Sequence, residues 1–231
     1  MRLRRQYGLT RISDLTGEST VAEACDAWLE SVHAKVAAGT LSRSTEVAYA
    51  ATVRLLLVPR CGAMTLDTLT VGRCDRLIQA ILLEQSVAAA RRARSVLSLV
   101  IGYAVRDDAM PRNPIRDVQR LPLPQKKLAV LTPTQIEGIR GLMEAWPLRR
   151  SKRGPRIDNL MLVDGMDIML GTSARVGECL ALRRCDVDVT GNAWASINGT
   201  IVTVPERGTY RKDTPKRSRQ IRRVALPARA A

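Results

Sequence analysis

The stretch Gly171–Val189, GTSARVGECLALRRCDVDV, combines the apolar spacing of an amphipathic helix with a short polar exit. Its Arg175 falls in the first turn of the expected helix, where the backbone amides already carry partial positive charge. The helix dipole disfavours a cation at this position unless the site holds an anion. A phosphate would be bound there by the guanidinium group of Arg175 and by the helix amides together. Glu178, one turn later, would then orient the arginine. The spacing alone also allows a solvated surface Arg beside a surface Glu.

The charge of the chain points to a polyanionic partner. The 231 residues carry a formal net charge of +15, from 37 Lys and Arg against 22 Asp and Glu. Nucleic acid is the leading candidate for the partner, ahead of an acidic membrane surface. The hydrophobic fraction of 45% predicts a core, which must be largely aliphatic because the sequence contains no Phe. The sequence has no apolar run of about 18 residues, and its basic N-terminus has no apolar h-region, so neither a membrane span nor a secretory signal is predicted.

The reactive side chains of the sequence do not assemble into a familiar enzyme site. The five cysteines form an odd count without a CxxC pair, which argues against a disulfide framework or a zinc site. Cys25, Cys74 and Cys179 fall on apolar helical positions and are expected to be buried. The one histidine, His33, falls on the charged side of a predicted helix, and neither a Walker A loop nor GxGxxG occurs. We therefore expect no metal or other cofactor, and a reduced, cytoplasmic, nucleoid-associated protein.

Periodicity and composition divide the chain into four parts. These are a basic N-terminal lead-in (1–18), a helical domain (19–110), a linker (111–130) and a second domain (131–231). Pro122 and Pro124, with basic residues around them, mark an exposed connection between the two domains.

Four amphipathic helices are predicted in the first domain. A capping box of Thr20 and Glu23 opens the first helix. The second helix is expected to start near Ser44 and to stop at Pro59, because proline cannot continue the hydrogen-bond ladder of a helix. Thr70 is the expected cap of the third helix, and the fourth carries several arginines in its first half.

The second domain is predicted to begin with helices and to end with short strands. Thr132, followed by Pro133 and Gln135, opens a helix with another capping box. The next apolar helix is expected to end at Gly171, as a C′ glycine. Short strands with Gly- and Asn-containing turns follow, and a last strand passes through Val224. The expected fold class is mainly α with a small β-hairpin or sheet.

Basic side chains are the remaining candidates for a binding site. Phosphate contacts are expected from Arg91, Arg92, Arg94, Arg149, Arg150, Lys152, Arg153 and Lys212. Such contacts would make the affinity for nucleic acid fall steeply with salt. Lys216 lies in a turn-like TPK before the last strand, from which it could reach a bound backbone. A solvated basic surface is the alternative interpretation for these residues.

Taken in order, these parts resemble the tyrosine recombinases, the phage-integrase family. GTSARVGECLALRRCDVDV resembles the family's TG-R-GE-L-L-W-D-D segment, and the closing TPKRSRQIRRVALP resembles its hairpin, PKT followed by R-V-LP. The four-helix unit, the RNP after its last helix and LTPTQI are also similar to the family. The resemblance covers about residues 20–227. It implies a SAM-like core-type DNA-binding domain at 19–110 and the N-terminal half of a mixed α+β catalytic domain at 131–231.

The resemblance also implies roles for individual residues. Arg175 would clamp the scissile phosphate, and Glu178 would support the site. Lys216 would protonate the departing 5′ hydroxyl, with Lys212 as the weaker candidate for this role. The family's reaction is a metal-free transesterification of double-stranded DNA through a 3′-phosphotyrosyl intermediate, and the family acts as a tetramer of protomers on DNA.

The sequence departs from the family pattern after the hairpin. The family places a His-x-x-Arg, a His or Trp and the nucleophilic Tyr there, whereas this sequence stops at Ala231. Tyr210 precedes Lys216 and does not match the nucleophile. We therefore expect a C-terminally truncated integrase that binds DNA and cannot cleave it alone. Two alternatives are a non-enzymatic DNA-binding protein that competes for attachment sites and a basic RNA-binding protein, which the order of the motifs disfavours.

Overall fold

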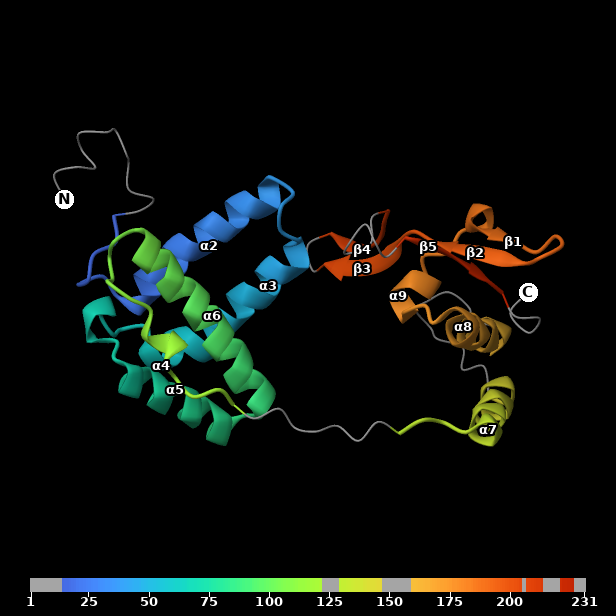
Figure 1. The fold of residues 1–231 in the computed structure, drawn as a ribbon, viewed down its shortest axis with the longest axis horizontal. Helices are drawn as coiled ribbons and strands as arrows, with labels where there is room; N and C mark the ends of the chain where they lie inside the picture. Colours follow the sequence, from blue (N-terminus) through green and yellow to red (C-terminus); the bar gives the residue numbers. More distant parts are fainter. Residues whose placement is uncertain (1–13, 122–128, 147–158, 205–206, 214–220, 227–231) are drawn as a thin grey trace, which may run out of the picture. The chain divides into compact units, whose positions relative to one another are not determined.

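The computed structural model divides the chain into two compact units, residues 1–125 and 126–231, and each is described by itself (Figure 1). The described residues are 14–121, 129–146, 159–204, 207–213 and 221–226. The predictions for Arg149, Arg150, Lys152, Arg153 and Lys216 lie outside these residues.

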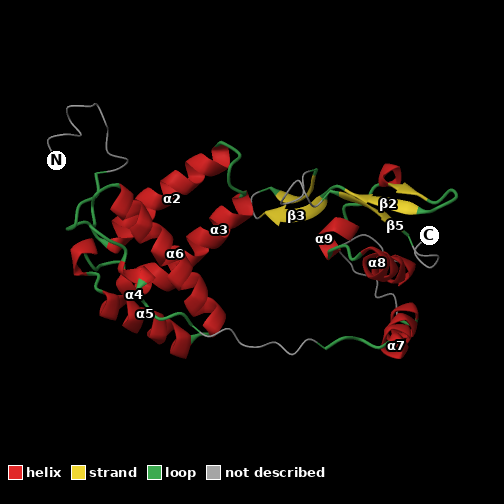
Figure 2. Ribbon diagram, viewed as in Figure 1, coloured by secondary structure: helices red, strands yellow, loops and turns green. Residues whose placement is uncertain are grey.

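The first unit is a helical bundle around one central helix. Its helices are α2 (Val21–Ala37), α3 (Arg43–Thr52), α4 (Val58–Cys61), α5 (Val71–Glu84) and α6 (Val87–Arg106). Helix α6 contacts α2, α3 and α5, so it passes through the middle of the bundle (Figures 1 and 2). Leu57, Ile78, Leu97 and Ile101 are fully buried there. The core is therefore aliphatic, as expected from a sequence without Phe.

Local capping signals predicted the starts of α2 and α5. The Thr20 hydroxyl accepts a hydrogen bond from the Glu23 N–H at 3.2 Å, and the Glu23 carboxylate accepts one from the Thr20 N–H at 2.7 Å. This capping box is confirmed, and Thr70 caps α5 as predicted. Both caps satisfy backbone donors that a helix leaves unpaired at its first turn.

The prediction that the second helix stops at Pro59 is wrong. Helix α3 continues through a π-helical segment, Val53–Leu57, directly into α4, which contains the proline. In this segment the N–H of Val58 bonds to the carbonyl of Val53, one residue further back than in an α-helix.

Arg60 compensates for the donor that proline lacks. In an α-helix the N–H of residue 59 would bond to the carbonyl of Leu55. Instead, Arg60 Nη1 donates to the carbonyls of Leu55 at 3.2 Å and Leu56 at 3.3 Å. The carboxylate of Glu84 on α5 holds the same guanidinium group at 2.6 Å. The helix therefore passes through proline because a side chain supplies the missing hydrogen bond.

The buried thiols of the first unit are packing residues. Cys25 and Cys74 are buried as predicted, and burial raises the pKa of Cys25 to about 12 and that of Cys74 to about 11. Because the thiolate is the reactive form, neither residue is a nucleophile near neutral pH. Cys179 in the second unit is only half-buried.

The segment after α6 packs back onto that helix. Residues Pro114–Arg116 form a 3-10 turn that Asn113 caps, with its Oδ1 accepting from the Ile115 N–H at 3.2 Å. The Asn113 amide also donates to the Ser98 carbonyl at 2.9 Å, and Ile115 and Val118 are buried in the bundle core. The first part of the predicted linker is thus built into the first unit.

The second unit combines helices with two small antiparallel sheets (Figure 2). Its elements are α7 (Pro133–Glu144), α8 (Asn159–Thr172), α9 (Val176–Cys179), β1 (Val187–Asp188), β2 (Trp194–Ile197), β3 (Thr200–Val204), β4 (Gly208–Lys212) and β5 (Arg222–Ala225). One sheet has the order β1-β2-β5, and β3 and β4 form a separate hairpin. The predicted capping box of Thr132 and Gln135 opens α7. The expected fold class, mainly helical with small sheets, is confirmed.

The end of α8 differs from the prediction. The helix does not end at Gly171 as a C′ glycine but includes Thr172, and Ser173 adopts the left-handed backbone with φ of 54°. The Thr172 hydroxyl donates to the Ile168 carbonyl at 2.6 Å and accepts from the Ala174 N–H at 3.2 Å. These two hydrogen bonds stabilise the turn that a left-handed glycine usually makes.

Candidate phosphate-binding site

Arg175 lies at the N-cap of α9, directly after the tight turn that ends α8. Its backbone is extended, with φ of −73° and ψ of 155°. The prediction of a long amphipathic helix over this stretch is wrong, because α9 is a single turn and a separate 3-10 turn, Arg184–Asp186, follows it. A helix this short has little dipole, so any anion held here must depend mainly on side chains.

Glu178 is the buried centre of the site. Its carboxylate accepts hydrogen bonds from Arg175 Nη1 at 2.8 Å, from the Arg175 backbone N–H at 3.1 Å and from Arg222 Nη2 at 3.0 Å. Only 5% of the Glu178 side chain is exposed, whereas 69% of the Arg175 side chain is exposed. The acid therefore holds two guanidinium groups, one from the N-cap of α9 and one from β5, and leaves that of Arg175 accessible to a ligand.

The Glu178 carboxyl is ionised near neutral pH. Burial opposes ionisation, but the hydrogen bonds from the Arg175 backbone and from the two guanidinium groups outweigh it and hold the pKa below its ordinary value. An ionised Glu178 orients Arg175 by a charge-assisted hydrogen bond. The outward N–H groups of Arg175 have the fork geometry that matches two oxygens of a phosphate.

A second buried acid, Asp186, connects the hairpin to this site. Its carboxylate accepts from Arg183 Nε at 2.9 Å and from the Asn198 amide at 2.6 Å, and it lies 3.7 Å from Arg211 Nη2. Arg211, on β4, also donates to the Ala181 carbonyl at 2.8 Å and to Asn198 Oδ1 at 2.6 Å. The hairpin β3-β4 is thereby attached to the chain that leaves α9.

Gly199, in the turn between β2 and β3, leaves room for the guanidinium group of Arg211. A Cβ added at Gly199 would lie 2.5 Å from the Arg211 guanidinium carbon. The sequence predicted a turn near this residue but gave no reason for its identity. The reason is the close approach of an arginine from the neighbouring strand.

Gly177 allows α9 to pack against β3, and its replacement by alanine is expected to destabilise the second unit. A Cβ at this position would lie 2.7 Å from Thr200 Oγ1 and 3.1 Å from the Ile201 carbonyl oxygen. Overpacking of this kind costs about 1–3 kcal/mol. Urea unfolding of Gly177→Ala measures the loss. Gly165→Ala in α8 is the matched control, because its Cβ would meet no atom within 4 Å and helix propensity favours alanine. Equal stabilities of the two variants would contradict this packing.

The stability of the second unit is expected to fall in acid. Hydrogen bonds from the Arg183 guanidinium lower the pKa of Asp186 against the opposing effect of burial, and the pKa of Glu178 is also lowered. A carboxyl with a lowered folded pKa contributes stability above its unfolded pKa of about 4, and this is lost as pH falls through the folded value. Urea midpoints measured from pH 7 to pH 3 should therefore drop below about pH 4. The drop should be smaller in Asp186→Asn, and an equal drop would contradict this assignment.

The structure places the other predicted residues as follows. Arg91 and Arg92 are exposed on α6, and Lys212 is half-buried at the end of β4, opposite Thr200. Arg94 is half-buried and its Nη2 donates to two backbone carbonyls, so part of its side chain stabilises the first unit. His33 is exposed and lies 3.0 Å from Glu46.

Sequence reasoning missed Arg222 and Arg211. Both belong to the basic C-terminal region, where the large number of arginines gave no reason to single out one of them.

Among the described residues, no three His, Cys, Asp or Glu side chains come together as a metal site. None of the helices in the described part of the chain is long and apolar enough to cross a membrane.

No family model and no curated protein matches this sequence. Solved structures match the fold. The Tn1549 transposon integrase in complex with a circular intermediate DNA has a TM-score of 0.71 at 18% identity, over 92% of this chain and 62% of that chain. The same integrase with transposon right end DNA gives 0.70 at 18% identity, over 91% and 62%. A lambda integrase tetramer bound to a Holliday junction gives 0.61 at 16% identity, over 87% and 50%.

The chain has the fold of these integrases. It spans about three fifths of the length of the Tn1549 integrase structures. The integrase fold that the resemblance implied is therefore confirmed, although the sequences have diverged to 18% identity or less.

Proposed function

We propose that this protein belongs to the tyrosine recombinase family, binds duplex DNA and holds a scissile phosphate at Arg175. The single observation that carries the proposal is the Arg175–Glu178–Arg222 cluster, built into a chain with an integrase fold. The activity proposed for the complete catalytic set is site-specific DNA recombination and integration.

The geometry suits a phosphate clamp. Glu178 is buried and ionised, so it fixes Arg175 without neutralising the outward side of its guanidinium group. Arg222, 31% exposed, adds a second positive charge beside the first. Preorganised cations of this kind stabilise the extra negative charge of a pentacoordinate phosphorane. Lys216, or Lys212 as the weaker candidate, would protonate the departing 5′ hydroxyl.

Binding to DNA would involve both units. The exposed arginines of α6 and the predicted basic loop Arg149–Arg153 would neutralise backbone phosphates. Other protomers are also proposed as partners, because lambda integrase is solved as a tetramer on a Holliday junction. Large apolar side chains exposed in the second unit, including Leu142, Met161 and Leu180, support further protein contacts. The proposed location is the cytoplasm, in association with the nucleoid.

We further propose that residues 1–231 bind DNA without cutting it. Tyr49 packs against Trp28 with ring centroids 5.2 Å apart, Tyr103 is buried, and Tyr210 lies beneath the Arg207 guanidinium group at 4.0 Å. Each described tyrosine therefore has a packing role. The same observation favours a second candidate function, a non-enzymatic DNA-binding protein that competes for attachment sites.

The proposal is tested with residues 1–231 and a nicked suicide substrate. We expect a gel shift of duplex DNA at low salt and no covalent adduct after denaturation in SDS, because none of the three described tyrosines is in place to attack the phosphate. Absence of a shift would overturn the proposed DNA binding, and a trapped adduct would overturn the proposed inactivity. Codons downstream that encode His-x-x-Arg and a late Tyr would favour the integrase over the competitor.

A further inference from the structure

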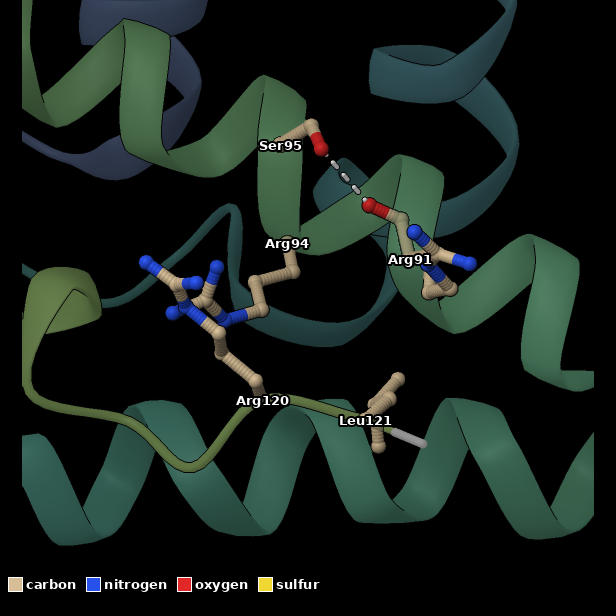
Figure 3. Close-up of a pocket in the computed structure, with 5 residues that line it drawn as sticks. All are labelled: Arg91, Arg94, Ser95, Arg120 and Leu121. Carbon is tan, nitrogen blue, oxygen red and sulfur yellow. Dashed lines mark hydrogen bonds between the residues drawn. The ribbon is translucent and has the colours of Figure 1, made fainter. Parts of the chain in front are cut away.

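A pocket in the first unit is lined by arginines from two segments of the chain (Figure 3). Its volume is about 350 Å³, and it lies between α6 and the segment that follows the 3-10 turn Pro114–Arg116. The lining residues are Arg91, Arg94, Ser95, Arg120 and Leu121. None of these five is acidic, so the described lining offers three positive charges and no negative one.

Arg94 is held in place before any ligand arrives. Its Nη2 donates to the carbonyl of Ile115 at 3.2 Å and to that of Val118 at 3.1 Å. These two bonds fix the plane of the guanidinium group, while its Nη1 makes no hydrogen bond to the described residues and its Nε is buried without a partner among them. The side chain is therefore preorganised, and its Nη1 keeps its hydrogen-bond donors for a ligand.

Arg120 brings a second guanidinium group next to the first. Both side chains line the same pocket, and in the view of Figure 3 their guanidinium groups fall in the same part of it, whereas Arg91 projects from α6 elsewhere. Two guanidinium groups that line one pocket repel each other, and an anion bound between them would attract both. Leu121, the neighbour of Arg120, packs against the core of the bundle and keeps this segment at the pocket.

We propose that this pocket binds one phosphate of a duplex DNA backbone, between Arg94 and Arg120; the inference rests on the proposed DNA-binding function. The guanidinium fork of Arg120 and the Nη1 of Arg94 would together donate to the two free oxygens of a phosphodiester. The bound phosphate would join α6 to the segment where the chain leaves the first unit. Arg92 does not line the pocket, so the three predicted arginines of α6 differ in function.

The test compares full-chain variants that remove one exposed arginine each. We expect Arg120→Ala to weaken the binding of a short duplex about tenfold, and Arg120→Lys to recover only part of this loss because lysine lacks the fork. Arg112→Ala is the matched control, since it removes the same charge from an exposed residue after α6 that does not line the pocket. It should change the affinity less than about threefold.

A second measurement uses inorganic phosphate as the probe. The Nε of Arg94 is buried, so we expect its N–H to exchange slowly with water and its ¹⁵N–¹H signal to report on the pocket in the whole chain. Phosphate should shift this signal in the wild type and in Arg112→Ala but not in Arg120→Ala. Circular dichroism confirms that each variant is folded.

The outcomes separate the two proposals. A wild-type chain that binds no duplex overturns the proposed function and, with it, the assignment of this pocket to DNA. A wild type that binds, with Arg120→Ala equal to Arg112→Ala, overturns the pocket alone. A phosphate-dependent shift of the Arg94 signal without loss of DNA affinity in Arg120→Ala makes the pocket a site for small anions, which also overturns its assignment to DNA.

Discussion

Replacement of Asp186 by alanine is expected to remove about 3 kcal/mol from the stability of the second unit. The carboxylate is 4% exposed and is hydrogen-bonded to Arg183 and Asn198, with Arg211 beside it. Without it, Arg211 loses a buried counter-charge and the hairpin β3-β4 loses its attachment to the chain after α9. Because Arg211 and Asn198 stay half-buried in the variant, the cost of removing their polar groups from water is no longer compensated.

Urea unfolding of residues 1–231 measures this effect, followed by the fluorescence of Trp194 on β2 in a background with Trp28 and Trp146 replaced by Phe. A loss of about 3 kcal/mol lowers the midpoint by about 2 M for a unit of this size. Asp213→Ala is the matched control, because Asp213 pairs with the same Arg211 but its side chain is 78% exposed. Asp186→Asn should give an intermediate value. If Asp186→Ala and Asp213→Ala lose equal stability, the buried network is not what holds the hairpin.

Duplex binding is expected to weaken about a thousandfold when salt is raised from 50 to 200 mM, as it does for proteins that neutralise about six phosphates. The chain has the required charge, with 37 Lys and Arg and a net charge of +15. Exposed arginines such as Arg91, Arg92, Arg120 and Arg175 are distributed over both units.

Fluorescence anisotropy across a salt series measures this dependence. A peptide nucleic acid duplex of the same sequence is the control, because it has base pairs but no phosphates and should not bind. A logarithmic slope shallower than about −2 would contradict a binding surface made of many phosphate contacts.

Features that depend on neighbouring residues could be predicted from the sequence. The capping boxes at Thr20 and Thr132 each involve residues three positions apart, so their pattern is complete within one turn. The alternating strand through Val224 is also local. The motif around Arg175 indicated its partner Glu178, three residues away, whereas the phosphate ligand of Arg175 stays a prediction.

Features that depend on distant residues could not be predicted in this way. The helix continues through Pro59 because of Arg60 and Glu84, which lie 24 residues apart. Arg222 reaches Glu178 across 44 residues. The spacing of apolar residues also predicted a longer helix than α9. That spacing contains no information about the β3 backbone, which approaches Gly177.

The π-helical segment before Pro59 gives the helix one residue more than an unbroken α-helix of the same rise would need. Each residue of an α-helix advances its direction by about 100°, so this extra residue sets the rotational phase of everything that follows. It lets Leu56 and Leu57, consecutive in the chain, both point into the core. It also aims Arg60 at Glu84. A deletion of one residue between Val53 and Leu57 would therefore rotate the following helix about its axis. It would turn the Arg60 side chain away from Glu84 on α5 while leaving the composition almost unchanged.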